Sequence, residues 1–243
     1  MRDRLLLLPG WGLGVAPLEP LAAVLRGLDA HLEVDIAPLP QPGSADVQAW
    51  LDELDARLPE HTWLGGWSLG GMLAALLAAR RGERCRGLLT LASNACFVQR
   101  HDWPHAMPEA DFAAFVAGCE HDPQATLKRF ALLCSQGGGD PRGVSRQLNA
   151  TLAAVAAPVL LDGLRVLGQL DIRQALQDFA GPQLHVFAGR DALVPGQAAS
   201  DVLDLLADVE TGLIEQASHA FILESPHSVA ATIRTFVRRG RDD

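Results

Sequence analysis

Short apolar runs alternate with helix-like stretches along the chain. The runs are continuous rather than alternating with polar residues, which is typical of strands buried on both faces of a parallel sheet. Leucine and alanine recur at helical spacing between them. The pattern therefore predicts an α/β fold, with helices on both faces of a mostly parallel sheet. The expected strands are Leu5–Leu8, Leu32–Ala37, Thr62–Gly66, Arg86–Ala92, Leu184–Ala188 and Glu210–Ile214, the last with the weakest pattern. The expected helices between the first strands are Pro17–Leu28, Val47–Leu58 and Gly71–Arg81.

The strand pattern is missing from one long stretch, residues 97–171. Helical patterns replace it, at Glu109–Cys119, Pro123–Cys134, Gly143–Thr151 and Pro158–Leu167. We expect this stretch to be an all-helical lid, inserted into a core formed by residues 1–96 and 172–243. Its place in the chain would put it over the carboxyl ends of the strands.

Composition narrows the class of protein. The chain has 243 residues, of which 49% are hydrophobic, so a large core can form without disulfides or metals. A net charge of −9 argues against nucleic acid as the partner. The four cysteines lie far apart without metal-ligand spacing, which indicates buried free thiols. Because no apolar run approaches the ~18 residues of a membrane span, we expect a cytoplasmic protein without a membrane partner. We also expect it to be monomeric.

The segment Gly66-Trp67-Ser68-Leu69-Gly70 matches the G-x-S-x-G turn that carries the nucleophile of α/β hydrolases. A glycine-rich structural turn could produce the same letters. However, this segment lies between an expected strand and an expected helix, as the nucleophile turn requires. We therefore predict that Ser68 is a catalytic nucleophile, with glycines at positions 66 and 70 because larger side chains would not fit.

A serine nucleophile needs a base and an acid. In this fold they follow the serine in the order acid, then histidine, each on a loop after a strand. Asp191 follows the expected strand Leu184–Ala188, although an aspartate there could also be an ordinary turn residue. Of eight histidines, His219 alone follows the last strand directly, and His227 is expected on the surface. The predicted triad is Ser68, Asp191 and His219.

Two backbone N–H groups are expected to stabilise the oxyanion intermediate. One belongs to Leu69, the residue after the nucleophile. The other belongs to Trp11, on the loop after the first strand. The indole of Trp11 could serve simple packing, but a tryptophan on this glycine-flanked loop is more plausibly a wall of the acyl pocket.

Several segments together point to one family. They are Gly10-Trp11-Gly12-Leu13, the Ser68 turn, Leu91-Ala92-Ser93-Asn94-Ala95-Cys96-Phe97, the strand-end Asp191, Asp171-Ile172-Arg173-Gln174 and Ser218-His219-Ala220-Phe221. With these segments the chain resembles the BioH family, the pimeloyl-[acyl-carrier protein] methyl ester esterases of biotin synthesis. The similarity spans nearly the whole chain. Two departures stand out: Pro9 replaces a histidine of the family, which should alter loop packing, and Asn94-Ala95 replaces Ser-Pro, which could shift the start of the lid.

This resemblance implies a substrate and its contacts. The substrate would be a pimeloyl methyl ester on acyl carrier protein, hydrolysed to methanol and a free carboxyl group without any cofactor or metal. The implied substrate-binding residues are Trp11, Ser68, Leu69, Phe130, Ala131, Leu132, Leu133, Cys134 and His219. The implied carrier-binding residues are Arg129, Arg142 and Arg146, while Ala125 stands where the family has a further arginine.

The distribution of charge along the chain is relevant to binding of an acyl carrier protein. Residues 124–170 carry a net charge of +3, which leaves −12 for the rest of a chain whose total is −9. A basic lid suits an acidic carrier, although it could also be a solvated face without a partner. Two other functions stay open: a general short-chain carboxylesterase or thioesterase with the same triad, and a ligand-binding protein that has kept the fold without catalysis.

Overall fold

The computed structural model describes residues 3–152 and 155–242. Its centre is a six-stranded sheet in which every neighbouring pair of strands is parallel, in the order β2-β1-β3-β4-β5-β6. The predicted parallel sheet is thereby confirmed. The strands are β1 (Asp3–Leu8), β2 (Leu32–Ile36), β3 (Thr62–Trp67), β4 (Cys85–Leu91), β5 (Gln183–Ala188) and β6 (Glu210–Ile214).

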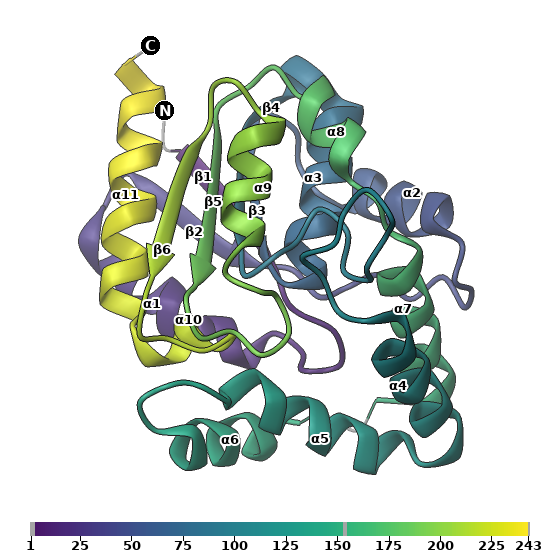
Figure 1. Ribbon diagram of the computed structural model, residues 1–243. Coiled ribbons are helices and arrows are strands. Elements are labelled where there is room, and N and C mark those ends of the chain that lie inside the picture. The colour runs from purple at the N-terminus through teal and green to yellow at the C-terminus, as the bar shows by residue number, and fades with distance from the viewer. Residues whose placement is uncertain (1–2, 153–154, 243) are drawn as a thin grey trace.

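Helices cover both faces of the sheet (Figure 1). On one face α1 packs against α11, and on the other α3 packs against α2 and α8. A further helix, α9, contacts β5 and β6. These elements are α1 (Glu19–Leu28), α2 (Val47–Arg57), α3 (Leu69–Arg81), α8 (Arg173–Asp178), α9 (Ala198–Leu205), α10 (Phe221–Glu224) and α11 (Pro226–Asp242), with 3-10 turns at Ala16–Leu18 and Gly82–Arg84. Among the described residues, no helix is long and apolar enough to cross a membrane.

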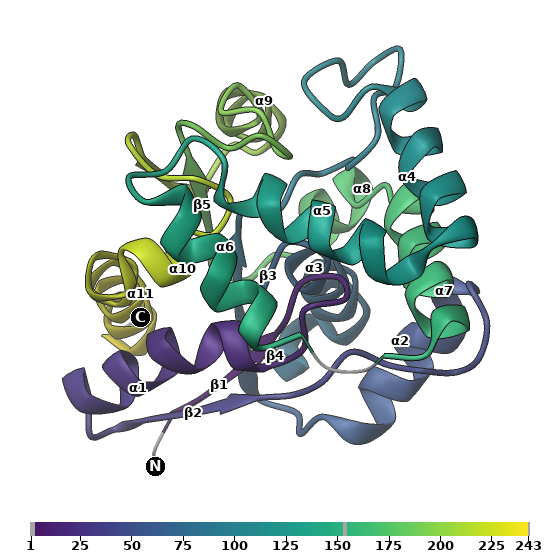
Figure 2. The same ribbon diagram turned by 90° about the horizontal axis from the view of Figure 1, so that it is seen from below.

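Between β4 and β5, the described part of residues 97–171 forms four helices, as the missing strand pattern predicts. They are α4 (Glu109–His121), α5 (Pro123–Ser135), α6 (Pro141–Ala150) and α7 (Ala157–Gln169). Asp122 and Asp140 begin α5 and α6, since each carboxylate accepts a backbone N–H of the first helical turn. Seen from below, α5 and α6 lie across the molecule in front of the sheet (Figure 2).

The two ends of this helical insertion are tied together at the core. Cys96 and Asp171 form an isolated antiparallel bridge, and the Ile172 N–H donates to the Ala95 carbonyl at 2.9 Å. These contacts lie where the sequence places the ends of the lid. The division of the chain at residues 97 and 171 stays a prediction.

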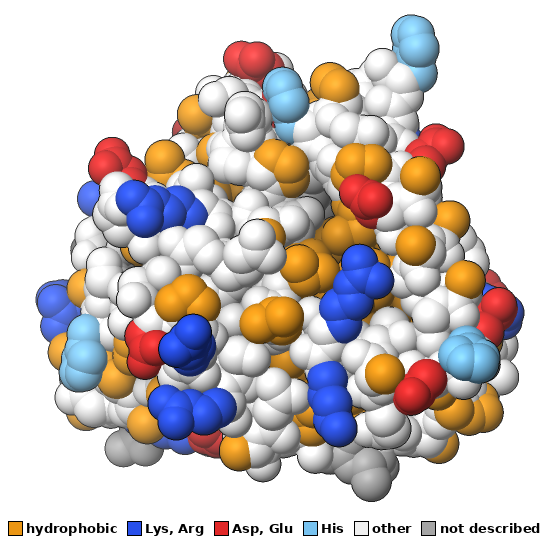
Figure 3. Space-filling view, turned by 60° about the horizontal axis from the view of Figure 1, so that its bottom comes forward, with side chains coloured by type: hydrophobic (Ala, Val, Ile, Leu, Met, Phe, Trp, Pro, Cys, Tyr) orange, Lys and Arg blue, Asp and Glu red, His pale blue; other side chains and the backbone are white. Residues whose placement is uncertain are grey.

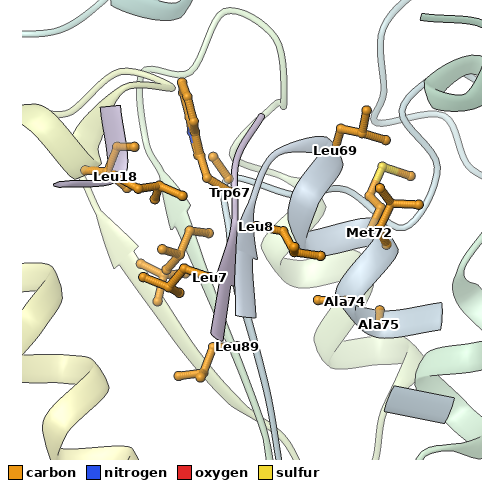
Figure 4. Close-up of a cluster of buried hydrophobic side chains, with 14 of the residues drawn as sticks. Leu7, Leu8, Leu18, Trp67, Leu69, Met72, Ala74, Ala75 and Leu89 are labelled. Atoms are coloured by element: carbon orange, nitrogen blue, oxygen red, sulfur yellow. The ribbon is translucent and has the colours of Figure 1, made fainter. Parts of the chain in front are cut away.

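The core lies on both sides of the sheet. Leu7 and Leu8 point to opposite sides of β1, Leu7 to the side on which Leu18 lies and Leu8 toward α3 (Figure 4). β3 is buried along its whole length. Alanine and leucine fill the buried side of α3, which lets that helix lie close against β3 and β4. The rigid β3–α3 unit is what holds the turn between them in place.

Candidate active site

Ser68 lies in the turn between β3 and α3 and adopts a strained backbone. Its φ of 56° and ψ of −122° fall where side chains are rarely found, at a typical cost of about 1–3 kcal/mol. A Cβ added at Gly66 would lie 2.2 Å from the Gly70 carbonyl carbon, and one added at Gly70 would lie 2.2 Å from the Leu8 carbonyl oxygen. Since both obstacles are backbone atoms, only glycine fits at either position, as the sequence predicts.

Hydrogen bonds fix the Ser68 backbone on both sides. Its N–H donates to the Leu91 carbonyl at 2.8 Å, and its carbonyl accepts from the Ser93 hydroxyl at 2.8 Å. The N–H of Gly71 donates to the same carbonyl at 3.0 Å and so begins α3 directly after the serine. The sequence-based start at Gly71 was therefore two residues late, because glycine weakens the helical pattern.

Asp191 and His219 form a buried pair. The His219 Nδ1 lies 2.7 Å from the Asp191 Oδ2, and the side chains are 0% and 1% exposed. The second oxygen, Asp191 Oδ1, accepts the N–H groups of Leu193 at 2.8 Å and Val194 at 2.9 Å. This arrangement holds the carboxylate toward Nδ1, which then carries the proton and leaves Nε2 as an acceptor. The structure thus brings together an acid and a histidine that lie 28 residues apart.

The Nε2 of His219 is buried and makes no hydrogen bond to any described residue, Ser68 included. Hydrogen bonds between nucleophile and base often tighten only when substrate is bound. Trp67, the neighbour of Ser68, fixes the histidine from the other side. Its indole N–H donates to the His219 carbonyl at 2.9 Å, and the two rings lie 5.6 Å apart.

The loop of His219 is also held by Glu224 and by the insertion. Glu224 Oε2 accepts the N–H of Ser218 at 2.8 Å and its hydroxyl at 3.0 Å. The Ala220 N–H donates to the carbonyl of Cys134, on α5, at 2.9 Å. Burial and the nearby Asp191 charge raise the pKa of the Cys134 thiol well above its usual value, so this thiol stays protonated. Sequence reasoning missed Trp67, Ser93 and Glu224 as parts of the site.

The two residues predicted to supply the oxyanion N–H groups lie on segments that adjoin Ser68. Leu69 is the first residue of α3, so its N–H has no acceptor within the helix. A Cβ built on Gly10 would lie 3.4 Å from the Ser68 Cβ, which places the loop of Trp11 against the serine. The Trp11 indole is buried, donates to the Leu160 carbonyl at 2.8 Å, and meets the Phe130 ring edge-on at 5.0 Å.

The predicted substrate contacts on α5 divide between two sides of that helix. Phe130, Ala131 and Cys134 are buried, and Leu133 is partly buried. Leu132 is 55% exposed. Helical geometry turns it toward the outer surface, so the structure does not place it with the other four.

The predicted carrier-binding arginines lie at the surface of the insertion, Arg129 on α5 and the other two on α6. Arg129, Arg142 and Arg146 are exposed, and none of them forms an ion pair with a described residue. The guanidinium of Arg129 lies over the Phe115 ring at 5.2 Å, whereas Arg165 pairs with Glu120 at 3.1 Å. Lys and Arg side chains are spread over this face among hydrophobic ones (Figure 3).

Comparison with known proteins agrees with this geometry. The model of the alpha/beta hydrolase family matches residues 5–232. The pimeloyl-[acyl-carrier protein] methyl ester esterase of Aromatoleum aromaticum is 34% identical over 250 residues, covering 98% of this chain and 99% of that protein. The chain belongs to this esterase family. The enzyme of the same name from Klebsiella pneumoniae is 33% identical and covers 91% of the chain and 88% of the enzyme.

Other relatives of the esterase family are longer. The chain is 34% identical to the biotin biosynthesis bifunctional protein BioHC of Cellvibrio japonicus, and the match covers 97% of the chain but 47% of that protein. The chain therefore spans about half the length of such bifunctional relatives. An esterase from Exiguobacterium antarcticum shares the fold, with a TM-score of 0.84 at 17% identity over 97% of this chain and 92% of that one.

Proposed function

We propose that the protein is a carboxylesterase that hydrolyses the methyl ester of a pimeloyl chain carried on acyl carrier protein, releasing methanol. The observation that carries the proposal is the buried His219–Asp191 pair beside the strained turn of Ser68. Membership in the esterase family supplies the substrate, because the relatives that match over most of their length are named for it.

The arrangement supports a triad mechanism. Ser68 Oγ attacks the ester carbonyl while His219 Nε2 takes its proton, and Asp191 stabilises the imidazolium that results. The N–H groups of Leu69 and Trp11 stabilise the negative oxygen of the tetrahedral intermediate. His219 then gives the proton to the departing methoxide oxygen. A water molecule, activated by the same histidine, hydrolyses the acyl-enzyme and frees Ser68.

We further propose that residues 97–171 act as a lid whose outer face binds the carrier. Arg129, Arg142 and Arg146 are exposed and pair with no acidic side chain of the described residues, which supports this role, since an acidic carrier is attracted to such a face. We also propose that the protein acts as a monomer in the cytoplasm. The four buried, unpaired cysteines agree with a reducing compartment.

The test compares methanol release from carrier-bound pimeloyl methyl ester with hydrolysis of p-nitrophenyl acetate. Wild type should act on both, and Ser68→Ala on neither. Arg142→Glu combined with Arg146→Glu should slow only the carrier-bound substrate. Its matched control is Arg238→Glu, near the end of α11 and away from the insertion (Figure 1). In a biotin auxotroph lacking this esterase, wild type alone should restore growth.

Three results would contradict parts of the proposal. Equal turnover of both esters, unaffected by the double arginine variant, would indicate a general short-chain esterase. Failure of a fluorophosphonate probe to label Ser68 in the folded protein would indicate a ligand-binding protein without catalysis. Growth restored equally by Ser68→Ala would refute the mechanism.

A further inference from the structure

Three consecutive glycines, residues 137–139, separate α5 from α6. They belong to the insertion, yet two of them lie against the loops of the core that carry Asp191 and His219. A third contact comes from the end of α5, where the Cys134 carbonyl accepts the Ala220 N–H at 2.9 Å. Because Ala220 directly follows His219, the insertion is bonded to the core at the residue next to the histidine.

Gly137 lies against the loop of the acid. Its φ is 94°, in the left-handed region that favours glycine. A Cβ added there would lie 2.2 Å from the carbonyl oxygen of Arg190 and 3.1 Å from its carbonyl carbon. Arg190 directly precedes Asp191, and its own N–H donates to the Ala217 carbonyl at 3.1 Å. Ala217 lies two residues before His219. The backbone of the insertion therefore approaches the acid loop at the point where that loop is bonded to the histidine loop.

Gly138 lies against Glu224, whose side chain holds the histidine loop. Glu224 Oε2 accepts the N–H and the hydroxyl of Ser218, whereas Oε1 is buried and bonds to no described residue. A Cβ added at Gly138 would lie 1.7 Å from that Oε1. The close approach of Gly138 therefore blocks the carboxylate on one side and keeps Oε2 directed at Ser218. Since Ser218 is fully buried and directly precedes His219, the turn restrains the histidine through a single side chain.

We propose, resting on the triad of the proposed function, that the end of α5 and the turn after it position the Asp191–His219 pair. Residues 134–138 thereby take part in setting kcat, although they belong to the insertion. Such restraint matters because His219 Nε2 makes no hydrogen bond to any described residue, so the loop around it has to hold the ring. Displacement of a reacting group by about 1 Å can cost 10²-fold in rate. Because the turn acts on the pair and not on the substrate, a change in it should lower kcat and leave KM nearly unchanged.

The test adds one methyl group to each of two neighbouring glycines. Gly138→Ala places its Cβ where Glu224 Oε1 lies, so the flexible carboxylate has to move away from Ser218 while the backbone can stay. Gly139→Ala is the matched control, because a Cβ there would meet nothing within 4 Å. Neither glycine has a positive φ, so both backbones accept alanine. We would measure kcat and KM with p-nitrophenyl acetate, and urea unfolding would establish that each variant is folded in the assay.

Gly138→Ala should lower kcat by roughly 10²-fold at nearly unchanged KM. It should also slow the labelling of Ser68 by a fluorophosphonate probe, which reports the reactivity of the nucleophile. Gly139→Ala should match wild type in both measurements. A wild-type kcat with a raised KM in Gly138→Ala would refute the positioning role, and so would equal losses in the two alanine variants.

A double-mutant cycle with Glu224→Ala tests the contact itself. Glu224→Ala removes the acceptor that holds Ser218, so it should also lower kcat at nearly unchanged KM. In this background a Cβ at position 138 meets no carboxylate, and adding Gly138→Ala should cost no further activity. If Gly138→Ala alone does not fold, the double variant should fold and show the kcat of Glu224→Ala. Losses that multiply in the double variant, or a double variant that does not fold, would overturn the inference.

Failure of the proposed function would look different. If wild type leaves carrier-bound pimeloyl methyl ester intact while the variants behave as expected on p-nitrophenyl acetate, the positioning role stands and the substrate assignment fails. If Ser68→Ala is inactive but Gly138→Ala is as active as Gly139→Ala, the triad stands and the positioning role fails. A Ser68→Ala variant with the wild-type rate on p-nitrophenyl acetate would refute both.

Discussion

At Asp191 the two carboxylate oxygens have different partners, and these partners determine which ring nitrogen of His219 carries the proton. Oδ1 faces two backbone N–H groups, and Oδ2 faces His219 Nδ1. An asparagine at this position would keep its amide oxygen toward the two N–H groups. Its NH₂ group would then point at Nδ1 and demand an acceptor there, so the imidazole proton would move to Nε2. In the proposed mechanism, His219 could then no longer accept the proton of Ser68.

We therefore predict that Asp191→Asn lowers kcat on p-nitrophenyl acetate by roughly 10⁴-fold, the loss typical of a wrong histidine tautomer. Stability to urea should change little, because the side chains have the same shape. Asp204→Asn, an exposed change on α9, is the control and should be fully active. A loss of less than tenfold in Asp191→Asn would show that another group orients the histidine.

At the scale of elements, the approach of α3 to β1 depends on a missing side chain. A Cβ at Gly70 would lie within 2.5 Å of three backbone atoms of Leu8 and Pro9, and backbone cannot rotate away as a side chain can. Gly27 on α1 is the opposite case, since a Cβ there would meet nothing within 4 Å. We expect Gly70→Ala to abolish folding or activity. Gly27→Ala should raise the free energy of unfolding by about 0.5–1 kcal/mol, as alanine favours helix over glycine. Thermal unfolding of both variants measures these changes in stability. If Gly70→Ala and Gly27→Ala changed the stability by the same amount, the packing of α3 against β1 described here would be contradicted.

The pairing of β4 with β5 includes a buried histidine that responds to pH. His185 bonds to Thr90 at 2.7 Å, and burial lowers its pKa from 6.5 to about 4. Since the folded pKa lies below that of the unfolded chain, the folded state favours the neutral ring. Stability is then complete above pH 6.5 and falls as the pH drops toward 4, by on the order of 3 kcal/mol. Urea unfolding between pH 7 and 4 should show that the free energy of unfolding declines in wild type and declines less in His185→Gln, whose side chain cannot titrate. Equal declines in the two proteins would mean that other groups cause the pH dependence.

Some of these features could be predicted from the sequence alone, and others could not. The order of Ser68, Asp191 and His219 along the chain, with each after a strand, follows from local patterns, and the parallel sheet then brings the three loops to one edge. The bond from Trp67 to the His219 carbonyl joins residues 152 apart, and no local pattern encodes it. The same holds for the contact of Gly138 with Glu224, which joins segments distant in sequence. The exposure of Leu132 is likewise set by how its helix packs, since Leu132 is 55% exposed while Ala131 is buried and Leu133 partly buried.

At the scale of the whole molecule, charge is divided between two regions. Residues 124–170 carry +3 and the remainder −12, so the proposed acidic carrier would be attracted to the insertion and repelled elsewhere. Such steering acts on the association rate and weakens as salt screens it, over a distance of about 10 Å at 0.1 M ionic strength.

We therefore expect kcat/KM for the carrier-bound ester to fall several-fold between about 0.02 and 0.5 M salt, over which screening shortens from tens of ångströms to a few. The rate on uncharged p-nitrophenyl acetate should stay constant over this range. Reversing the charges of Arg142 and Arg146 should make kcat/KM for the carrier-bound ester nearly independent of salt, because the attraction that salt screens is then already lost. Arg238→Glu should keep the salt dependence of wild type. A salt dependence that is identical in all three proteins would mean that the carrier approaches by another face. Equal salt effects on both esters would instead locate the effect in the chemistry at Ser68.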